Sequence, residues 1–117
     1  MTALADKHCT DLPKGTPALT DTEAAALLDQ LGEGWWIEGD TLSCRFKTRN
    51  FALALEIANR IGELAEAEDH HPDIKLGWGY CEAGFTTHSV GGLSENDFIC
   101  AARIDALGLG DKAGSNG

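Results

Sequence analysis

The feature that most constrains the fold is a long amphipathic segment that runs from Asn50 to Asp69 and is brought to an end by Pro72. Asn50 has the side chain of a helix N-cap, and a proline cannot continue an α-helix because its ring removes the backbone N–H. Apolar residues recur along the segment at helical spacing. They are Phe51, Ala54, Leu55, Ala58, Ile61, Leu64 and Ala65. The pattern predicts one helix over 50–69 with a single apolar stripe that another layer must cover.

Two pairs of short strands flank this helix in the sequence. Residues 35–38 and 41–46 are separated by Gly39-Asp40, a dipeptide typical of hairpin turns, and residues 74–78 and 80–88 are separated by a glycine. In the second strand of each pair, residues alternate with a period of two, which predicts an antiparallel sheet with one face buried. The residues expected to face inward are Leu42, Cys44, Phe46, Cys81, Ala83, Phe85 and Thr87.

Two further helices are predicted from their capping residues. Thr20 followed by Glu23 forms a capping-box pattern that opens a helix extending to Leu31, and Ser94 followed by Asp97 opens a third helix. The order of elements is then α-β-β-α-β-β-α. This order predicts an α+β fold, a four-stranded antiparallel sheet with three helices packed on one face.

The chain of 117 residues is expected to form one domain, over residues 19–109. Residues 1–18 show no periodicity and are expected to form an irregular N-terminal arm, and residues 110–117 a flexible tail. Strand pairs on both sides of a helix leave open sheet edges. We therefore expect self-association to cover them, in a homodimer or homotetramer.

The charge of the chain argues against two classes of partner. The chain has 9 basic and 19 acidic residues and a net charge of −10, whereas nucleic acids and anionic membranes attract basic surfaces. It contains no apolar run of membrane-spanning length, and its N-terminus lacks the apolar core of a signal peptide. We expect a cytoplasmic protein with no nucleic-acid or membrane partner.

The cysteines, Cys9, Cys44, Cys81 and Cys100, are widely spaced and form no CxxC pair. A zinc ribbon and a CxxC redox motif are therefore disfavoured. Cys44 and Cys100 fall in apolar patterns and are expected to be buried thiols in a reducing compartment. His8 stands beside Cys9 but has no partner at metal-ligand spacing, so no metal site is predicted there.

Candidate catalytic residues gather around the end of the long helix. Glu66 lies four residues before His70, so the two would share a helix face. Imidazole exchanges protons near neutral pH, which suits His70, His71 and His88 to acid/base catalysis. Carboxylates, here Glu66 and Asp97, fix the tautomers of neighbouring imidazoles. No GxSxG, P-loop or GxGxxG pattern supports acyl transfer, nucleotide hydrolysis or dinucleotide binding.

Structural roles and a metal site are the alternatives for these residues. Histidines at the C-terminal end of a helix compensate its dipole, and Asp97 completes a capping box. An isolated histidine such as His88 is typical of a sheet edge. An aromatic residue such as Trp78 is typical of a core or an interface. Glu66, His70 and His88 would supply the zinc ligands of a metal-dependent hydrolase, although the Glu/His pair has no convincing third and fourth ligand.

The spacing of these residues resembles the signature of the pterin-4a-carbinolamine dehydratases. Glu66 is followed after three residues by His70-His71-Pro72, and then by Trp78, His88 and Asp97 after five, nine and eight further residues. Other similar features extend over residues 20–107. They are Gly34-Trp35, the strand ending in Phe46, Asn50-Phe51-Ala52-Leu53-Ala54, Thr87-His88, Gly92-Leu93-Ser94 and Asn96-Asp97-Phe98. A motif of this length, built from individually uncommon residues, makes the resemblance specific.

The resemblance implies an α+β fold, dimers or tetramers, and a reaction that needs no metal or organic cofactor. Members of this family dehydrate 4a-hydroxytetrahydrobiopterin, which aromatic amino acid hydroxylases leave, to the quinonoid dihydropterin. The resemblance assigns three catalytic histidines and four supporting or substrate-binding residues to the site: His70, His71 and His88, then Glu66, Pro72, Trp78 and Asp97.

Within this implied site, His70 and His88 are expected to form the principal acid/base pair. His71 would orient the pterin and share in proton transfer, and the carboxylates of Glu66 and Asp97 would set tautomer and charge. Relatives of the dehydratases also act as a dimerisation cofactor of a transcription factor or as assembly factors for other enzymes. A non-enzymatic role on the same fold is therefore the first alternative, and a zinc hydrolase the less favoured one.

Overall fold

The computed structural model describes residues 3–110. Its helices and strands are α1 (Asp21–Leu28), β1 (Trp35–Glu38), β2 (Thr41–Lys47), α2 (Phe51–Glu68), β3 (Asp73–Gly77), β4 (Tyr80–Phe85) and α3 (Glu95–Ala106). Two short 3-10 helices are added to them, η1 (Leu4–Asp6) before α1 and η2 (His88–Val90) after β4. The predicted order α-β-β-α-β-β-α is confirmed.

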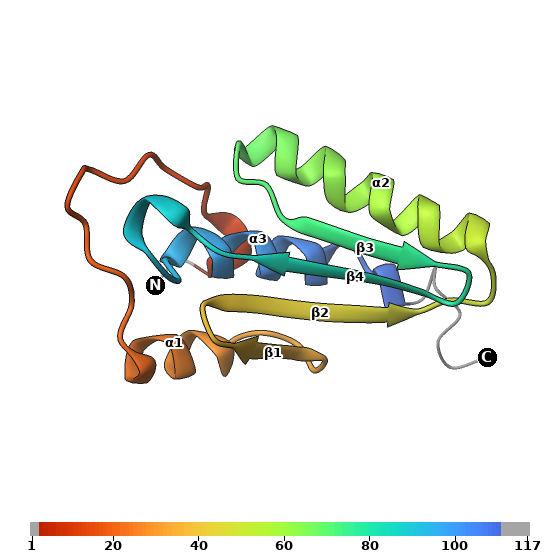
Figure 1. Ribbon diagram of the computed structural model, residues 1–117, viewed down its shortest axis with the longest axis horizontal. Coiled ribbons are helices and arrows are strands. Elements are labelled where there is room, and N and C mark those ends of the chain that lie inside the picture. Colours follow the sequence, from red (N-terminus) through yellow and green to blue (C-terminus); the bar gives the residue numbers. More distant parts are fainter. Residues whose placement is uncertain (1–2, 111–117) are drawn as a thin grey trace.

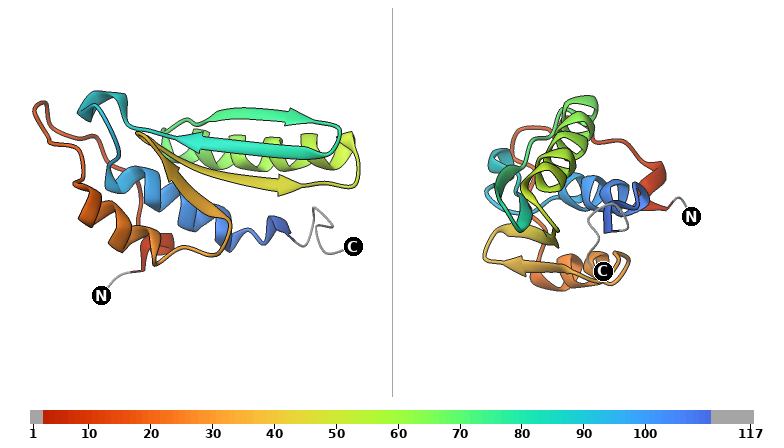
Figure 2. Two further views of the ribbon diagram at one scale, coloured as in Figure 1. Left: turned by 60° about the horizontal axis from the view of Figure 1, so that its bottom comes forward. Right: turned by 90° about the vertical axis from the view of Figure 1, so that its right-hand side faces the viewer.

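All four strands pair antiparallel in one sheet of order β1-β2-β4-β3. The three helices lie on one face of this sheet, as predicted (Figure 1, Figure 2). Figure 1 shows four chain segments collected at one end of the sheet: the end of α2, the start of β3, the end of β4 and the start of α3. The candidate histidines lie within three residues of the ends of α2 and β4, and Asp97 lies in the first turn of α3.

The inward face of the sheet is apolar, as the alternation predicted. Register places Cys44 opposite Ala83 and Phe46 opposite Cys81, so the inward side chains of β2 and β4 line up in rows. Phe46 is only half-buried, at the end of the row. The buried core of sheet and helices includes Leu42, Cys44, Ala54, Ile57, Ile61, Cys81, Ala83, Phe85, Phe98, Cys100 and Ile104. The expectation that Cys44 and Cys100 are buried is confirmed.

Helix α2 buries or partly buries the predicted stripe, except for two of its residues near the N-terminus of the helix. Asn50 caps it, as expected, by accepting a hydrogen bond from the backbone N–H of Leu53 at 2.8 Å. The buried residues are Ala54, Ile57, Ile61, Ala65 and Glu68. Phe51 and Leu55, which were predicted to lie in the stripe, are exposed. The prediction was wrong for Phe51 and Leu55. The buried residues of α2 are spaced three and four apart and include Ile57, which the predicted stripe did not contain.

Helix α1 begins as predicted and ends earlier. Thr20 and Glu23 exchange the two hydrogen bonds of a capping box. The helix ends at Leu28 rather than Leu31, because the backbone N–H groups of Gln30 and Leu31 bond to carbonyls only three residues back. Such bonds form tighter 3-10 turns than an α-helix.

The segment before α1 lies against α3. Leu4 of η1 is buried in the core, Lys7 forms an ion pair with Glu95 at 2.7 Å, and Arg103 donates to the Lys7 carbonyl at 2.7 Å. The flexible tail expected over 110–117 falls, beyond residue 110, outside the described residues. Among residues 3–110, no helix combines the length and apolarity that crossing a membrane requires.

Candidate active site

Helix α2 ends in a Schellman motif that sets the directions of the two adjacent histidines. The backbone N–H of His70 donates to the carbonyl of Ala65 at 3.1 Å, and that of Asp69 donates to the carbonyl of Glu66 at 3.3 Å. Asp69 takes the left-handed conformation, with φ of 52°, that glycine usually adopts at this position. The chain therefore leaves the helix before His70, so His70 and His71 do not follow its surface.

His70 lies against Asp97, a fully buried carboxylate of α3. His70 Nε2 and Asp97 Oδ1 are 2.6 Å apart, and only 13% of the His70 side chain is exposed. The ring also stacks on Phe85, with the two centroids 5.9 Å apart. An ionised carboxylate can only accept hydrogen bonds, so Nε2 carries the proton and Nδ1 is left as an acceptor. The contact fixes one tautomer of His70.

Asp97 also caps α3 and ends a chain of hydroxyl groups. Its Oδ2 accepts the backbone N–H of Ser94 at 2.9 Å and the hydroxyl of Thr87 at 2.8 Å. Because the Thr87 hydrogen is used there, the Ser94 hydroxyl, 2.8 Å away, donates to Thr87 Oγ1. The predicted capping box is confirmed. Asp97 thus holds a helix end and an imidazole at the same time.

His71 turns to the surface and pairs with Glu66. Its Nε2 contacts Glu66 Oε2, and both side chains are more than half exposed. The expectation that Glu66 shares a face with His70 is wrong, because the left-handed Asp69 turns His70 toward α3. The candidate site therefore contains one buried imidazole–carboxylate pair, His70 with Asp97, and one exposed pair, His71 with Glu66. Solvent strongly screens only the exposed pair.

His88 begins η2 instead of ending a strand. Strand β4 ends at Phe85, and the backbone of Thr87 bridges across the loop that follows. The prediction of a strand as far as His88 was wrong because Gly91, with φ of 71°, closes a tight turn there. The His88 side chain is exposed. Since Thr87 donates to Asp97, the backbone of His88 lies one residue from the buried pair.

Pro72 and Trp78 stand at opposite ends of β3. Pro72 precedes Asp73, the first residue of β3, so the strand starts directly after the two histidines. Trp78 lies in the turn between β3 and β4, where 70% of its surface is exposed. The five residues of β3 span roughly 17 Å of extended chain, so a single chain does not bring Trp78 to the histidines.

Glu66 and His70, two of the zinc ligands considered above, point to different partners in the structure. Glu66 contacts His71, whereas His70 contacts Asp97. Within residues 3–110, no group of at least three histidine, cysteine, aspartate or glutamate side chains is placed so that it could hold a metal ion. Imidazoles held by carboxylates are instead the arrangement that general acid/base catalysis uses.

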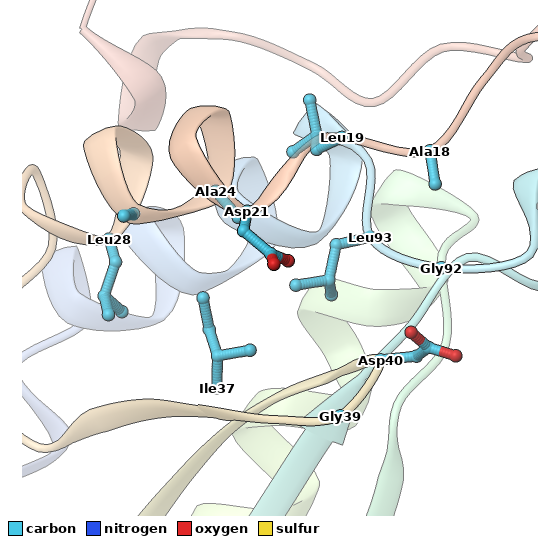
Figure 3. Close-up of a pocket in the computed structure, with 11 residues that line it drawn as sticks. Ala18, Leu19, Asp21, Ala24, Leu28, Ile37, Gly39, Asp40, Gly92 and Leu93 are labelled. Atoms are coloured by element: carbon cyan, nitrogen blue, oxygen red, sulfur yellow. The ribbon is translucent and has the colours of Figure 1, made fainter.

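A cavity of about 270 Å³ lies between α1, the β1–β2 turn and the loop before α3 (Figure 3). Its wall is largely apolar, with Leu28, Ile37 and Leu93, and the carboxylates of Asp21 and Asp40 lie beside it. None of the candidate catalytic residues lines this cavity. It is therefore separate from the two imidazole–carboxylate pairs.

A second cavity, of about 310 Å³, opens on the face of the sheet that the helices leave uncovered. Several polar residues line it, among them Ser43, Lys75 and Glu82. Asp73 and Thr86 also line it. These two residues directly follow Pro72 and precede Thr87, so this cavity adjoins the candidate site along the chain.

Comparison with protein families shows to which family the chain belongs. Residues 17–107 match the family described as pterin 4 alpha carbinolamine dehydratase. The chain belongs to this family. A relative from Halorhodospira halophila is 48% identical over 108 residues, which cover 91% of this chain and 98% of the relative. A relative from Methylococcus capsulatus is 47% identical over 107 residues, which cover 90% and 93%. Both carry pterin-4-alpha-carbinolamine dehydratase as a provisional name.

Two solved structures share the dehydratase fold. A Brucella melitensis protein, described as a transcriptional coactivator/pterin dehydratase, is 27% identical with a TM-score of 0.71, over 83% of this chain and 99% of that one. A pterin dehydratase-like protein, described as a RuBisCO assembly factor in the α-carboxysome, is 25% identical with a TM-score of 0.54, over 65% and 94%. The fold is thus shared by proteins with enzymatic and with assembly descriptions.

Three features of this structure had not been predicted from the sequence. Phe85 stacks on His70, Thr87 donates to Asp97, and Glu68 is buried although it stands in an acidic run. A signal existed for Thr87, which the strand alternation places on the inward face beside Phe85. Glu68 gave no such signal, because its neighbours Glu66 and Asp69 are exposed acidic residues and its partner Cys9 is 59 positions away.

Proposed function

We propose that this protein dehydrates pterin-4a-carbinolamine (4a-hydroxytetrahydrobiopterin) to the quinonoid dihydropterin and water, in tetrahydropterin recycling. The proposal rests on the buried contact between His70 Nε2 and Asp97 Oδ1 at 2.6 Å, in a chain of the dehydratase family. That contact leaves His70 Nδ1 as a fixed proton acceptor, which a base in this reaction requires. An aromatic amino acid hydroxylase is the proposed source of the substrate.

The reaction needs two proton transfers. One proton is removed from the ring nitrogen beside carbon 4a, and one is delivered to the hydroxyl group that leaves carbon 4a as water. In the proposed mechanism His70 Nδ1 takes the nitrogen proton, and His88, whose exposed ring exchanges protons with solvent, donates to the hydroxyl. Positioned imidazoles contribute ~10²–10⁴-fold to such transfers. Because the step is a loss of water without oxidation, imidazoles suffice and no metal or organic cofactor is proposed.

His71 and Glu66 have a supporting role in this mechanism. Their contact lies at the surface, where solvent screens the charges and other hydrogen-bond partners compete. His71 is proposed to orient the pterin and to share in proton transfer, with Glu66 holding its ring. The adjoining cavity on the open sheet face offers hydroxyl and carboxylate groups, such as Ser43 and Asp73, to a polar heterocycle.

The test is the decay of chemically made 4a-hydroxytetrahydropterin in the presence of single alanine variants. His70→Ala and His88→Ala are each expected to slow the catalysed rate by ~10²–10⁴-fold, and His71→Ala by less. Glu63→Ala is the matched control, since Glu63 lies exposed on the same helix as Glu66 and forms an ion pair with Arg60 at the surface. If all three histidine variants stay folded and keep the wild-type rate, the assignment is refuted.

A non-enzymatic role on this fold is the second candidate function. The structural likeness to a protein described as a RuBisCO assembly factor favours it. The same decay measurement separates the two candidates, because a folded wild-type protein that does not accelerate loss of the carbinolamine leaves only a dimerisation or assembly role. The retained pair of His70 and Asp97 supports the enzymatic candidate.

Self-association into a homodimer or homotetramer is part of the proposal. Phe51 and Leu55 are exposed on the N-terminal half of α2, and Trp78 is exposed in the neighbouring β3–β4 turn. Thr48 ties these segments together, because its hydroxyl donates to the Trp78 carbonyl at 3.3 Å and its N–H to the Gly79 carbonyl at 3.0 Å. Exposed apolar patches of this kind mark protein interfaces.

Light scattering tests the oligomeric state. The wild type is expected to have the mass of a dimer or tetramer, and Leu55→Lys is expected to lower it. Glu63→Lys introduces the same side chain on the polar side of α2 and should leave the mass unchanged. A wild-type protein that remains monomeric at high concentration would contradict self-association.

A further inference from the structure

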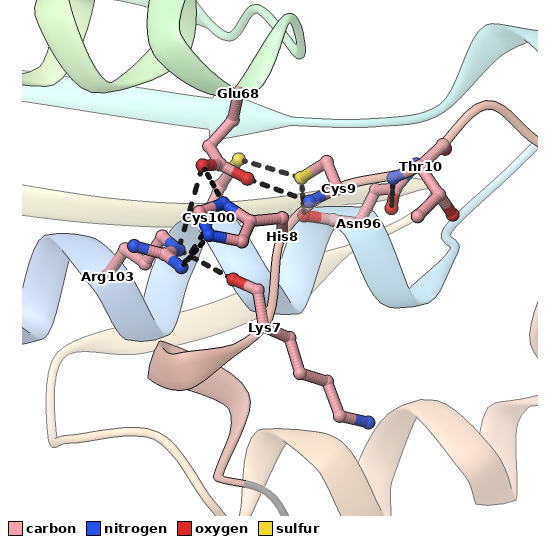
Figure 4. A network of polar contacts seen from close by, with 8 residues as sticks. All are labelled: Lys7, His8, Cys9, Thr10, Glu68, Asn96, Cys100 and Arg103. Atoms are coloured by element: carbon pink, nitrogen blue, oxygen red, sulfur yellow. Dashed lines mark hydrogen bonds and ion pairs between the residues drawn. The ribbon is translucent and has the colours of Figure 1, made fainter.

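The N-terminal segment brings two thiols together outside the site described above. Cys9 and Cys100 of α3 are 91 positions apart in the sequence, yet their Sγ atoms lie 3.5 Å apart (Figure 4). Both are free thiols. A disulfide bond has a length of about 2.05 Å, so a small displacement of one side chain suffices for bonding. The pair is not of the CxxC kind, and sequence spacing gives no sign of it.

The backbone around Cys9 is restrained, so the approach of the two thiols is built into the fold. The Asn96 side chain forms two hydrogen bonds with the backbone of Thr10. It accepts one from the Thr10 N–H at 3.1 Å and donates one to the Thr10 carbonyl at 2.8 Å. The N–H of Cys9 itself donates to Glu68 Oε1 at 2.7 Å. Since Glu68 ends α2 and Asn96 lies in the first turn of α3, the segment is held against both helices (Figure 4).

Glu68 is suited to anchor this segment because it stays ionised. Burial alone would raise the pKa of its carboxyl group. The backbone N–H of Cys9, the His8 ring and the charge of Arg103 outweigh that effect and hold the pKa below its ordinary value of 4.5. Hydrogen bonds to an ionised carboxylate are stronger than those between neutral groups. The carboxylate therefore fixes the Cys9 backbone firmly at neutral pH.

The two thiols differ in their access to solvent. Cys9 is partly exposed, whereas Cys100 is fully buried. The hydrogen bond with Cys9, together with burial, raises the pKa of the Cys100 thiol far above its ordinary value of 9.0. Burial also raises the pKa of Cys44 to about 12 and that of Cys81 to about 11. An oxidant that arrives from solvent therefore meets Cys9 first.

We propose that Cys9 and Cys100 are a peroxide-sensitive thiol pair, whose disulfide locks the N-terminal segment onto α3. The Cys9 sulfur attacks one peroxide oxygen, the O–O bond breaks, and a sulfenic acid and one water form. The Cys100 sulfur then attacks the Cys9 sulfur, the S–O bond breaks, and a second water leaves with the Cys100 proton. The two thiols lose two electrons and the peroxide gains them. A thiol reductant reverses the modification.

The test uses the full chain and hydrogen peroxide in small molar excess. Intact mass is expected to fall by two hydrogen atoms, and digestion without reductant is expected to yield one cross-linked peptide that joins Cys9 to Cys100. Cys44 and Cys81 should remain available to alkylation after unfolding. Hydrogen exchange at residues 7–10 should become slower on oxidation and return to its first rate after reduction.

Single variants separate this pair from other thiol chemistry. Cys9→Ser should abolish the cross-link and leave Cys100 reduced. Cys44→Ala is the matched control, since Cys44 is also buried, and it should still form the cross-link; the wild-type peptide map decides the matter if this variant does not fold. Three results would overturn the proposal: over-oxidation of Cys9 without a cross-link, a Cys9–Cys9 bridge between chains, or four thiols that remain unmodified.

Discussion

Replacing Asp97 with asparagine keeps the shape of the side chain and reverses one hydrogen bond. The Ser94 N–H and the Thr87 hydroxyl both donate to Oδ2, so the amide oxygen of the variant must stay on that side. Its NH₂ group then faces His70 Nε2, which in the wild type lies 2.6 Å from Oδ1. Two N–H groups cannot share one hydrogen bond, so Nε2 becomes the acceptor and the ring proton moves to Nδ1. The proposed base nitrogen is then occupied.

The expected loss of activity is large and the loss of stability is moderate. A positioned base contributes ~10²–10⁴-fold, which corresponds to about 3–5 kcal/mol of barrier. The three hydrogen bonds to residue 97 can all remain, but none of them is then made to a charged carboxylate. A hydrogen bond to a charged group is stronger than one to a neutral group by about 1 kcal/mol. A buried neutral amide costs less desolvation than a buried carboxylate, which offsets part of the difference. The free energy of unfolding is therefore expected to fall by about 1–3 kcal/mol. A domain with ordinary stability stays folded.

Two measurements check this prediction on the same Asp97→Asn sample. The catalysed decay of 4a-hydroxytetrahydropterin gives the rate, and nitrogen NMR of the imidazoles reports which nitrogen of His70 carries the proton. Glu95→Gln is the control, because it removes the same charge from the first turn of α3 at a surface contact with Lys7. A variant that keeps the proton on Nε2, or that moves it to Nδ1 and keeps the full rate, would refute the reasoning.

Substitutions at three other residues test the surroundings of the pair. Asp69→Gly should raise stability in urea unfolding by about 0.5–1 kcal/mol by relieving the left-handed backbone, and Asp69→Ala should lower it. Glu68→Gln should lower stability by about 1–3 kcal/mol at pH 7. Because the folded-state pKa of Glu68 is depressed, its contribution is present above the ordinary value of 4.5 and is lost as the pH falls through the folded value, so the variant and the wild type should converge in acid. Glu66→Gln should slow dehydration less than about fivefold, since exposed pairs contribute about 0–1 kcal/mol, and a larger loss would contradict a supporting role.

Elements whose determinants lie close together in the sequence could be predicted. The caps at Thr20, Asn50 and Ser94 depend on partners only three residues away, and each was found where the pattern placed it. The alternation in β2 and β4 depends on a period of two and gave the inward face of the sheet correctly. The residues of the candidate site were also accessible from sequence, because their types and spacing form a long motif.

Features that depend on distant contacts could not be predicted. Glu68 resembles its exposed acidic neighbours, and its burial depends on Cys9, which is 59 positions away. The direction of His70 depends on the left-handed turn at Asp69, where a glycine would have given the usual signal. The roll of α2 that exposes Phe51 depends on how closely the helix packs on the sheet, which the apolar residues of one stripe do not determine.

The strained turn at Asp69 and the buried pair explain each other. If α2 continued for another turn, His70 would lie on its surface beside Glu66, and Asp97 would keep only its Ser94 and Thr87 donors. A left-handed conformation at a non-glycine residue costs roughly 1–2 kcal/mol. A charged hydrogen bond to a buried carboxylate contributes about 1.5–3 kcal/mol, and a buried carboxylate without its partner is more costly still. The turn is therefore stable because it delivers His70 to Asp97, and the same turn leaves His71 at the surface. Adjacent histidines thus acquire different surroundings from a single backbone residue that carries no catalytic group.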